Sequence, residues 1–160
     1  SRILTAPMQL ISRSVGRVYY KEAADSIRVS KQKIMSTFKN TVSRIAKLGL
    51  IPSALVIVFA PILIKWFLGD EWTVAGTFMQ IMMPWIFFQF VNMPVSTTFS
   101  VVNRQGIGFL LIVISVLVRY AVMYYWHETA IIQITALSIV ASLFYITYTV
   151  SSYLAIKEIK

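Results

Sequence analysis

Apolar residues fill the chain beyond residue 47 in four long runs that contain almost no charge. A helix needs about 20 apolar residues to cross roughly 30 Å of hydrocarbon, and each run reaches that length. The runs therefore predict four transmembrane helices, at about 48–68, 74–103, 106–126 and 130–156.

The connectors between these spans are only a few residues long, so consecutive spans are expected to be antiparallel neighbours. The fold class predicted for the chain is all-α, a polytopic transmembrane helix bundle. The second span is longer than a bilayer requires, because no charge lies between Glu71 and Arg104. We expect it to tilt, or to kink at Pro84 and Pro94.

The segment before the spans is predicted to have two parts. Residues 1–20 are expected to be the end of an upstream transmembrane helix, because the chain opens in an apolar run too short to span, which suggests a carboxy-terminal fragment. Residues 21–47 are expected to form a basic amphipathic helix at the cytoplasmic surface. Two roles stay open for its apolar stripe, packing on the protein itself or lying on lipid. The stripe consists of Ile27, Ile34, Phe38, Val42 and Ile45.

The net charge of +9 is concentrated at the start of the chain. Residues 1–47 hold ten basic and two acidic residues, whereas residues 48–160 hold five and four. A basic segment beside apolar spans is typical of the cytoplasmic side of a membrane protein and does not indicate a nucleic-acid surface. The connectors alternate in sign along the chain, which predicts that both ends are cytoplasmic.

No constellation of side chains predicts catalysis or a metal site. The chain has no cysteine and one histidine, His127, which lies in a predicted outer turn without a nucleophile beside it. We therefore expect neither an enzyme nor a cofactor.

Arg119 is the most informative residue, because it lies about three positions from the centre of the third span. A charge at that depth needs a partner, and none of the four spans contains an Asp or Glu. Its partner must be an acid from another part of the protein, backbone carbonyls, water or an anionic substrate.

Polar side chains follow one face of the predicted second span. The spacing of three, four and seven residues places them on a single helical stripe. They are Gln89, Asn92, Ser96 and Asn103. The stripe is compatible with a wet cavity and equally with hydrogen bonding between helices. A second polar face in the fourth span favours helix packing, and it consists of Thr135, Ser138, Ser142 and Thr149.

Two groups of motifs resemble a known family. The first runs from Pro7 to Ala24 and contains the string SVGRVYYKEAA. The second is a succession of short motifs between Phe67 and Gln105, namely FLGDEW, AG, MPW, MPVS and NRQ. Their order resembles that of bacterial polysaccharide repeat-unit flippases of the Wzx type, which handle O-antigen or exopolysaccharide units. These belong to the multidrug/oligosaccharidyl-lipid/polysaccharide exporter superfamily.

The resemblance implies a two-bundle, MATE-like transporter of the bacterial inner membrane, of which this chain would be the carboxy-terminal part. It further implies translocation of an undecaprenyl-diphosphate-linked oligosaccharide from the cytoplasmic to the periplasmic leaflet, for lipopolysaccharide or exopolysaccharide biosynthesis. Its expected partners are the lipid-linked oligosaccharide, membrane lipids, the amino-terminal half of the transporter and the polysaccharide polymerase machinery. The expected substrate-binding residues are Arg119, Arg13, Arg17, Gln89, Asn92 and Ser96.

Three other classes of protein compete with this interpretation. A multidrug or cation exporter of the same fold would need an acidic cavity, and the fragment offers basic and neutral groups there. A non-transporting membrane assembly subunit would use the polar stripes only as helix contacts. An integral-membrane polymerase or ligase would need a large polar loop, and both outer turns are short.

Overall fold

The computed structural model describes residues 2–125 and 129–159, with side chains from residue 13 onward. His127 lies outside the described residues. Every regular element in the described ranges is helical. The elements are α1 (Arg2–Val29), α2 (Lys31–Leu68), the 3-10 turn η1 (Asp70–Trp72), α3 (Thr73–Val95), α4 (Thr98–Val101), α5 (Gln105–Tyr125) and α6 (Ala130–Lys157).

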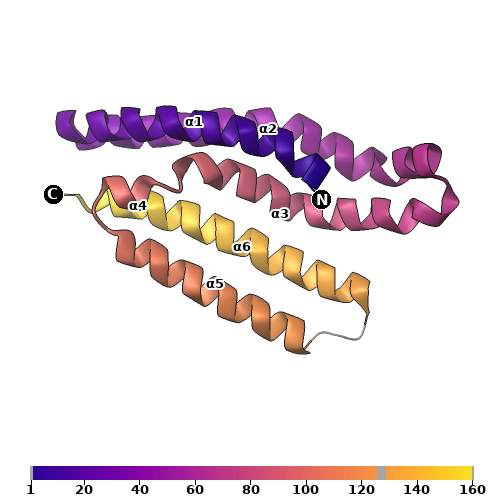
Figure 1. Cartoon of the computed structure of the whole chain (residues 1–160). Coiled ribbons are helices and arrows are strands. Elements are labelled where there is room, and N and C mark those ends of the chain that lie inside the picture. The colour runs from indigo at the N-terminus through magenta and orange to yellow at the C-terminus, as the bar shows by residue number, and fades with distance from the viewer. Residues whose placement is uncertain (1, 126–128, 160) are drawn as a thin grey trace.

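Four of these segments are long and apolar enough to cross a membrane. They are α2, the segment from η1 to α4 that contains α3, and the helices α5 and α6. Consecutive spans run in opposite directions, as Figure 1 shows. The predicted all-α class with four potential spans is thus confirmed. Helix α1 lies along α2 and α3, α3 packs between α2 and α6, and α5 packs mainly against α6.

The helix boundaries before the first span differ from the predicted segments. Residues 21–29 continue α1, and residues 31–47 continue without a break into the apolar part of α2. The chain turns at Ser30, whose backbone is extended and whose Oγ accepts a hydrogen bond from the Lys33 amide at 3.2 Å. A serine in this position satisfies one of the free amides at the start of a helix, so a new helix begins there.

The predicted apolar stripe on this segment faces the protein. Ile34, Phe38 and Ile45 are at most 3% exposed. Ile34 and Phe38 pack with Tyr19 of α1 and Val95 of α3. The basic part of α2 therefore packs on the rest of the chain through its apolar side, and Lys33, Arg44 and Lys47 are exposed.

The main helix of the second span, α3, ends earlier than predicted. Helix α3 stops at Val95, a turn at residues 96–97 follows, and Asn103 adopts a positive φ of 55°. Pro94 lacks an amide hydrogen and its ring opposes the carbonyl four residues earlier, and it lies in the last turn of α3. Asn103 consequently does not share the helical face of Gln89 and Asn92. By contrast, α3 continues through Pro84.

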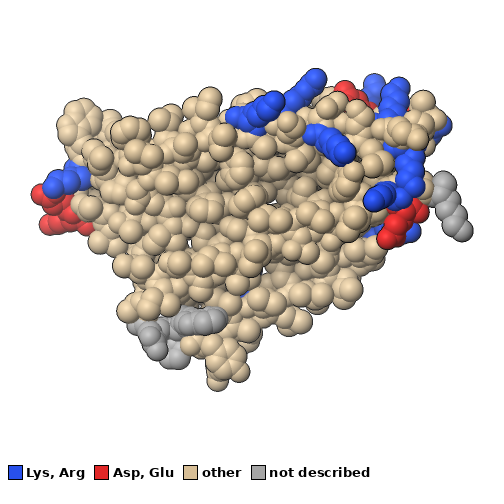
Figure 2. Space-filling view, turned by 180° about the vertical axis from the view of Figure 1, so that it is seen from behind, with Lys and Arg blue, Asp and Glu red and all other residues tan. Residues whose placement is uncertain are grey.

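Charged side chains gather at the two ends of the bundle. Figure 2 shows lysine and arginine mainly over one end and along the α1–α2 side, with a broad uncharged surface elsewhere on that face. At this end Arg104 pairs with Glu158, and Lys31 Nζ donates to the Ile159 carbonyl at 2.8 Å. Lys65 and Asp70 form an ion pair of 2.8 Å at the opposite end. We call these the basic end and the Asp70 end.

Helices α2 and α3 approach closely at Gly76. A Cβ atom at this position would lie 2.5 Å from Pro61 Cα and 2.9 Å from Pro61 N. Real Cβ atoms do not approach backbone so closely, so the contact between these helices requires glycine.

Gly76→Ala is therefore expected to destabilise the protein by about 1–3 kcal/mol, the usual cost of overpacking. Gly106→Ala is the matched control, because a Cβ there meets nothing within 4 Å and alanine favours a helix. Unfolding of the whole protein by sodium dodecyl sulfate, followed by circular dichroism, measures both. Equal stability of the two variants would contradict the close contact.

Candidate functional site

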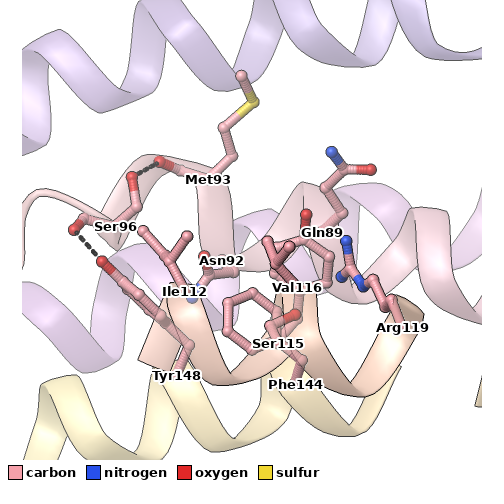
Figure 3. Close-up of a pocket in the computed structure, with 11 residues that line it drawn as sticks. Gln89, Asn92, Met93, Ser96, Ile112, Ser115, Val116, Arg119, Phe144 and Tyr148 are labelled. Atoms are coloured by element: carbon pink, nitrogen blue, oxygen red, sulfur yellow. Dashed lines mark hydrogen bonds between the residues drawn. The ribbon is translucent and has the colours of Figure 1, made fainter. Parts of the chain in front are cut away.

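A groove lies between α3 and α5, with α6 as its floor. Helices α3 and α5 each pack against α6 but make no substantial contact with each other in the described residues. The groove encloses a cavity of about 320 Å³. Figure 3 shows the side chains that line it. They are Gln89, Asn92, Met93 and Ser96 from α3 and the turn after it, Ile112, Ser115, Val116 and Arg119 from α5, and Phe144, Tyr145 and Tyr148 from α6.

Helical spacing explains why these side chains meet. Positions three and four residues apart share one face of a helix. Residues 89, 92, 93 and 96 follow that spacing on α3, and residues 112, 115, 116 and 119 follow it on α5. The groove thus brings together four of the six predicted binding residues, namely Arg119, Gln89, Asn92 and Ser96.

Among the described residues, Arg119 is surrounded by aromatic rings and pairs with no acid. Its guanidinium carbon lies 5.4 Å from the ring centres of Trp85 and Phe144 and 5.9 Å from that of Tyr145. Such cation–π contacts stabilise the charge, but ring faces are poor substitutes for oxygen acceptors. Within the described residues, the buried Nε and Nη2 atoms of Arg119 have no hydrogen-bond partner. Leaving such donors without an acceptor is costly, so Arg119 requires an acceptor from outside the described residues.

Asn92 and Ser96 are engaged within the protein. Asn92 is 4% exposed, and its Nδ2 donates to Thr149 Oγ1 of α6 at 2.9 Å. Ser96 Oγ donates to the Met93 carbonyl at 2.8 Å, and Tyr148 OH donates to the Ser96 carbonyl at 3.2 Å, both drawn in Figure 3. Of the two interpretations of the polar stripe, hydrogen bonding between helices therefore holds for Asn92.

The polar face of α6 likewise serves helix packing. Ser138 is 3% exposed, and its Oγ donates to the Ile81 carbonyl of α3 at 2.6 Å. Ser142 Oγ donates to the Ser138 carbonyl within α6 at 2.7 Å. These bonds fix α6 beneath α3 and thereby build the floor of the groove.

Arg13 and Arg17 do not line the groove. Both are exposed on α1, on either side of Val15, which packs against the cluster around Ile45 and Phe90. Helix α1 approaches α3 closely nearby, since a Cβ on Gly16 would lie 3.5 Å from Pro94 Cα. The structure therefore separates Arg13 and Arg17, both predicted to bind substrate, from Arg119.

The aromatic neighbours of Arg119 were not among the predicted site residues. Trp85 lies four residues before Gln89, so the spacing of the polar stripe was a signal that could have found it. Phe144 and Tyr145 are on α6, and no periodicity within one helix reveals which residue of another helix faces it.

Among the described residues, no three His, Cys, Asp or Glu side chains lie together as a metal site. No known protein family, curated protein or solved structure matches the chain.

The hydrogen bonds in the groove predict different effects of two substitutions on the stability of the protein. Asn92→Leu removes a buried bond between helices and is expected to cost about 1 kcal/mol. Arg119→Met breaks no hydrogen bond, removes two unpaired donors and keeps an apolar stem against the rings, so we expect no loss of stability. Detergent unfolding of both variants tests this, and a loss above about 2 kcal/mol for Arg119→Met would show that the protein itself supplies its partner.

Proposed function

We propose that the chain is the carboxy-terminal part of a flippase that moves undecaprenyl-diphosphate-linked oligosaccharides from the cytoplasmic to the periplasmic leaflet of the bacterial inner membrane. The observation that carries this proposal is the guanidinium of Arg119, which lines the α3–α5 groove with two buried nitrogens that have no acceptor.

The chemistry of Arg119 suits a diphosphate. A guanidinium presents its N–H groups in a fixed fork that matches phosphate oxygens and stays charged at any physiological pH. Arg119 lies 14 residues into α5, roughly 21 Å from the start of the helix. A cation at this depth, without an acid beside it in the described residues, is suited to an anion that travels through the membrane.

The motifs that resemble the flippase family support the same proposal by their positions. Trp85, from the motif MPW, lies against the guanidinium of Arg119. Ser96, from MPVS, lines the groove. Gly76, from AG, lets α2 and α3 approach. Thus Trp85 and Ser96 lie at the groove, and Gly76 forms a contact between two of the helices.

The charge distribution supports a cytoplasmic location for the basic end, where the carboxy terminus and the turn between α1 and α2 lie, whereas the first residues of α1 lie part-way along the bundle (Figure 1). On the face shown in Figure 2, lysines and arginines gather at the basic end and along the α1–α2 side. Such residues accumulate on the cytoplasmic side of membrane proteins. Trp66, Trp72 and Tyr125 are exposed at the opposite end, where aromatic side chains favour the membrane interface. In the proposed MATE-like transporter, an amino-terminal bundle would complete the cavity.

The groove disfavours the rival classes. A cation exporter would place carboxylates where this groove carries Arg119. A non-transporting assembly subunit accounts for Asn92 and Ser138, whose bonds join helices, but gives no role to the unpaired guanidinium.

Transfer of radiolabelled undecaprenyl-diphosphate oligosaccharide across proteoliposomes tests the proposal, with the whole protein and its Arg119→Ala and Arg119→Lys variants. We expect transfer by the wild type and a fall of at least about tenfold in Arg119→Ala, the order expected when a charged hydrogen bond is lost. Partial activity is expected in Arg119→Lys, since lysine keeps the charge but not the fork.

Gly106→Ala serves as the control for handling and insertion, because its position is open. Absence of transfer by correctly inserted wild-type protein would overturn the proposed function. Full transfer by Arg119→Ala would instead remove Arg119 from the substrate path.

A further inference from the structure

The outward face of α2 changes from basic to apolar within about one helical turn. Exposed side chains at spacings of three and four residues follow the side of α2 opposite its buried residues. Arg44 and Lys47 are the last two cations of this face before an apolar stretch, and Lys65 ends that stretch near the Asp70 end. The side chains between them are each at least 53% exposed. We call them the outer apolar stripe, which consists of Ile51, Leu55, Val58 and Ile62.

The length of the outer apolar stripe matches the hydrocarbon of a bilayer. Lys47 and Lys65 are 18 residues apart, or about 27 Å along the helix, and the hydrocarbon is about 30 Å thick. Arg44 lies about 4.5 Å beyond Lys47, within a headgroup layer of roughly 5–8 Å on each side. Lys33, on the same face, lies about 21 Å beyond Lys47 and therefore outside that layer. Arg44 and Lys47 are thus the two cations of this face at headgroup depth.

These two cations have no acidic partner in the part of the chain that the structure describes. Both side chains are exposed, and the ion pairs there join Lys65 to Asp70 and Arg104 to Glu158. Exposed cations beside hydrocarbon, without an anion from the protein, attract anionic groups at the membrane surface.

Helix α1 adds positive charge at the same depth. Val15 packs against the cluster that contains Ile45, which lies between the two cations in the sequence. Arg13 and Arg17 flank Val15 and are exposed. The acidic side chains of α1 are Glu22 and Asp25. Both lie closer to the basic end than Arg17, so the surface at headgroup depth is positively charged.

We infer that the outward face of α2 binds an anionic phospholipid of the surrounding bilayer. Its phosphate accepts hydrogen bonds from Arg44 and Lys47, and its acyl chains lie along the outer apolar stripe. A zwitterionic lipid carries its own cation beside the phosphate, so the two unpaired charges favour a lipid with a net negative charge, as in phosphatidylglycerol. The inference does not depend on the proposed function.

The position of this face favours a lipid over another part of the protein. The buried face of α2 packs against α1 and α3, so the outward face points away from the α3–α5 groove, which the amino-terminal bundle would complete. Figure 2 shows the cations of the α1–α2 side beside a broad uncharged surface. An acidic segment of a soluble protein would satisfy the cations but leave the outer apolar stripe uncovered, whereas a phospholipid covers both.

Lipid titration followed by native mass spectrometry tests the inference. The whole protein is freed of lipid in a neutral detergent, and the Kd of the first bound lipid is measured for phosphatidylglycerol and for phosphatidylcholine with the same acyl chains. We expect phosphatidylglycerol to bind at least about tenfold more tightly, since each cation at the membrane surface contributes roughly a fivefold preference for an anionic headgroup.

Three variants locate the site. Replacing both cations, by Arg44→Gln and Lys47→Gln, is expected to weaken phosphatidylglycerol binding at least about tenfold and to leave phosphatidylcholine binding unchanged. Arg44→Lys keeps the charge and is expected to retain the preference within about threefold. Lys33→Gln is the matched control, because it removes an exposed cation from the same face outside the headgroup layer, and it should bind as the wild type does.

Four outcomes would overturn the inference. Equal affinity of the wild type for the two lipids would show that the cations do not select a headgroup. A preference retained by the double variant would place the lipid elsewhere, and an equal loss in Lys33→Gln would indicate diffuse attraction to the net charge. Displacement of phosphatidylglycerol by inorganic phosphate would assign the two cations to a free anion. None of these results bears on transport, so the proposed function is tested separately.

Discussion

The main physical constraint on the groove is the free-energy cost of placing the charged Arg119 side chain in an apolar span, where it has no hydrogen-bond acceptor among the described residues. Arg119 lies well inside α5, and the described residues give it three aromatic rings but no hydrogen-bond acceptor. Cation–π contacts offset part of the cost of removing the guanidinium from water. They leave its donors unsatisfied, which is expensive in a protein interior and more so in hydrocarbon. The unsatisfied donors of Arg119 therefore require a hydrogen-bond acceptor from outside the described residues.

The rest of the fold maintains the groove in which that charge lies. Gly76 brings α3 against α2, and Ser138 and Asn92 bind α3 to α6. Helix α5 packs mainly on α6, so the space between α3 and α5 is not closed by packing. Asn92, a candidate for lining a wet cavity, instead joins α3 to α6, whereas Arg119 and Trp85 keep buried donors that have no partner among the described residues.

Much of the fold could be predicted from hydropathy, because length and charge alone decide whether a helix can span a membrane. The predicted spans 106–126 and 130–156 lie within one residue of α5 and α6 at each end. Hydropathy could not find the end of α3, because no charged residue lies between it and Arg104. It also could not show that residues 31–47 and the first span form one helix, α2. A change from polar to apolar residues along the chain does not break a helix.

The site was predictable to a lesser extent. Depth in the span identified Arg119, and helical spacing identified Gln89, Asn92 and Ser96. Which of these side chains keep free hydrogen-bonding groups depends on how the helices pack against one another. The hydrogen bond from Asn92 to Thr149 could not be predicted for this reason. The same holds for Arg13 and Arg17, whose separation from Arg119 depends on how α1 packs against α2 and α3.

The central claim, that Arg119 binds the phosphate of a lipid-linked substrate, is tested most directly by solid-state magnetic resonance. Dipolar coupling is measured between ¹⁵N in the Arg119 guanidinium and ³¹P in undecaprenyl-diphosphate oligosaccharide, with the whole protein in bilayers. The signal is assigned by its loss in Arg119→Gln. The account predicts coupling that corresponds to an N–P distance under about 5 Å, as a direct N–H···O–P bond requires. Coupling to a ¹³C-labelled protein carboxylate, with none to phosphorus, would contradict it.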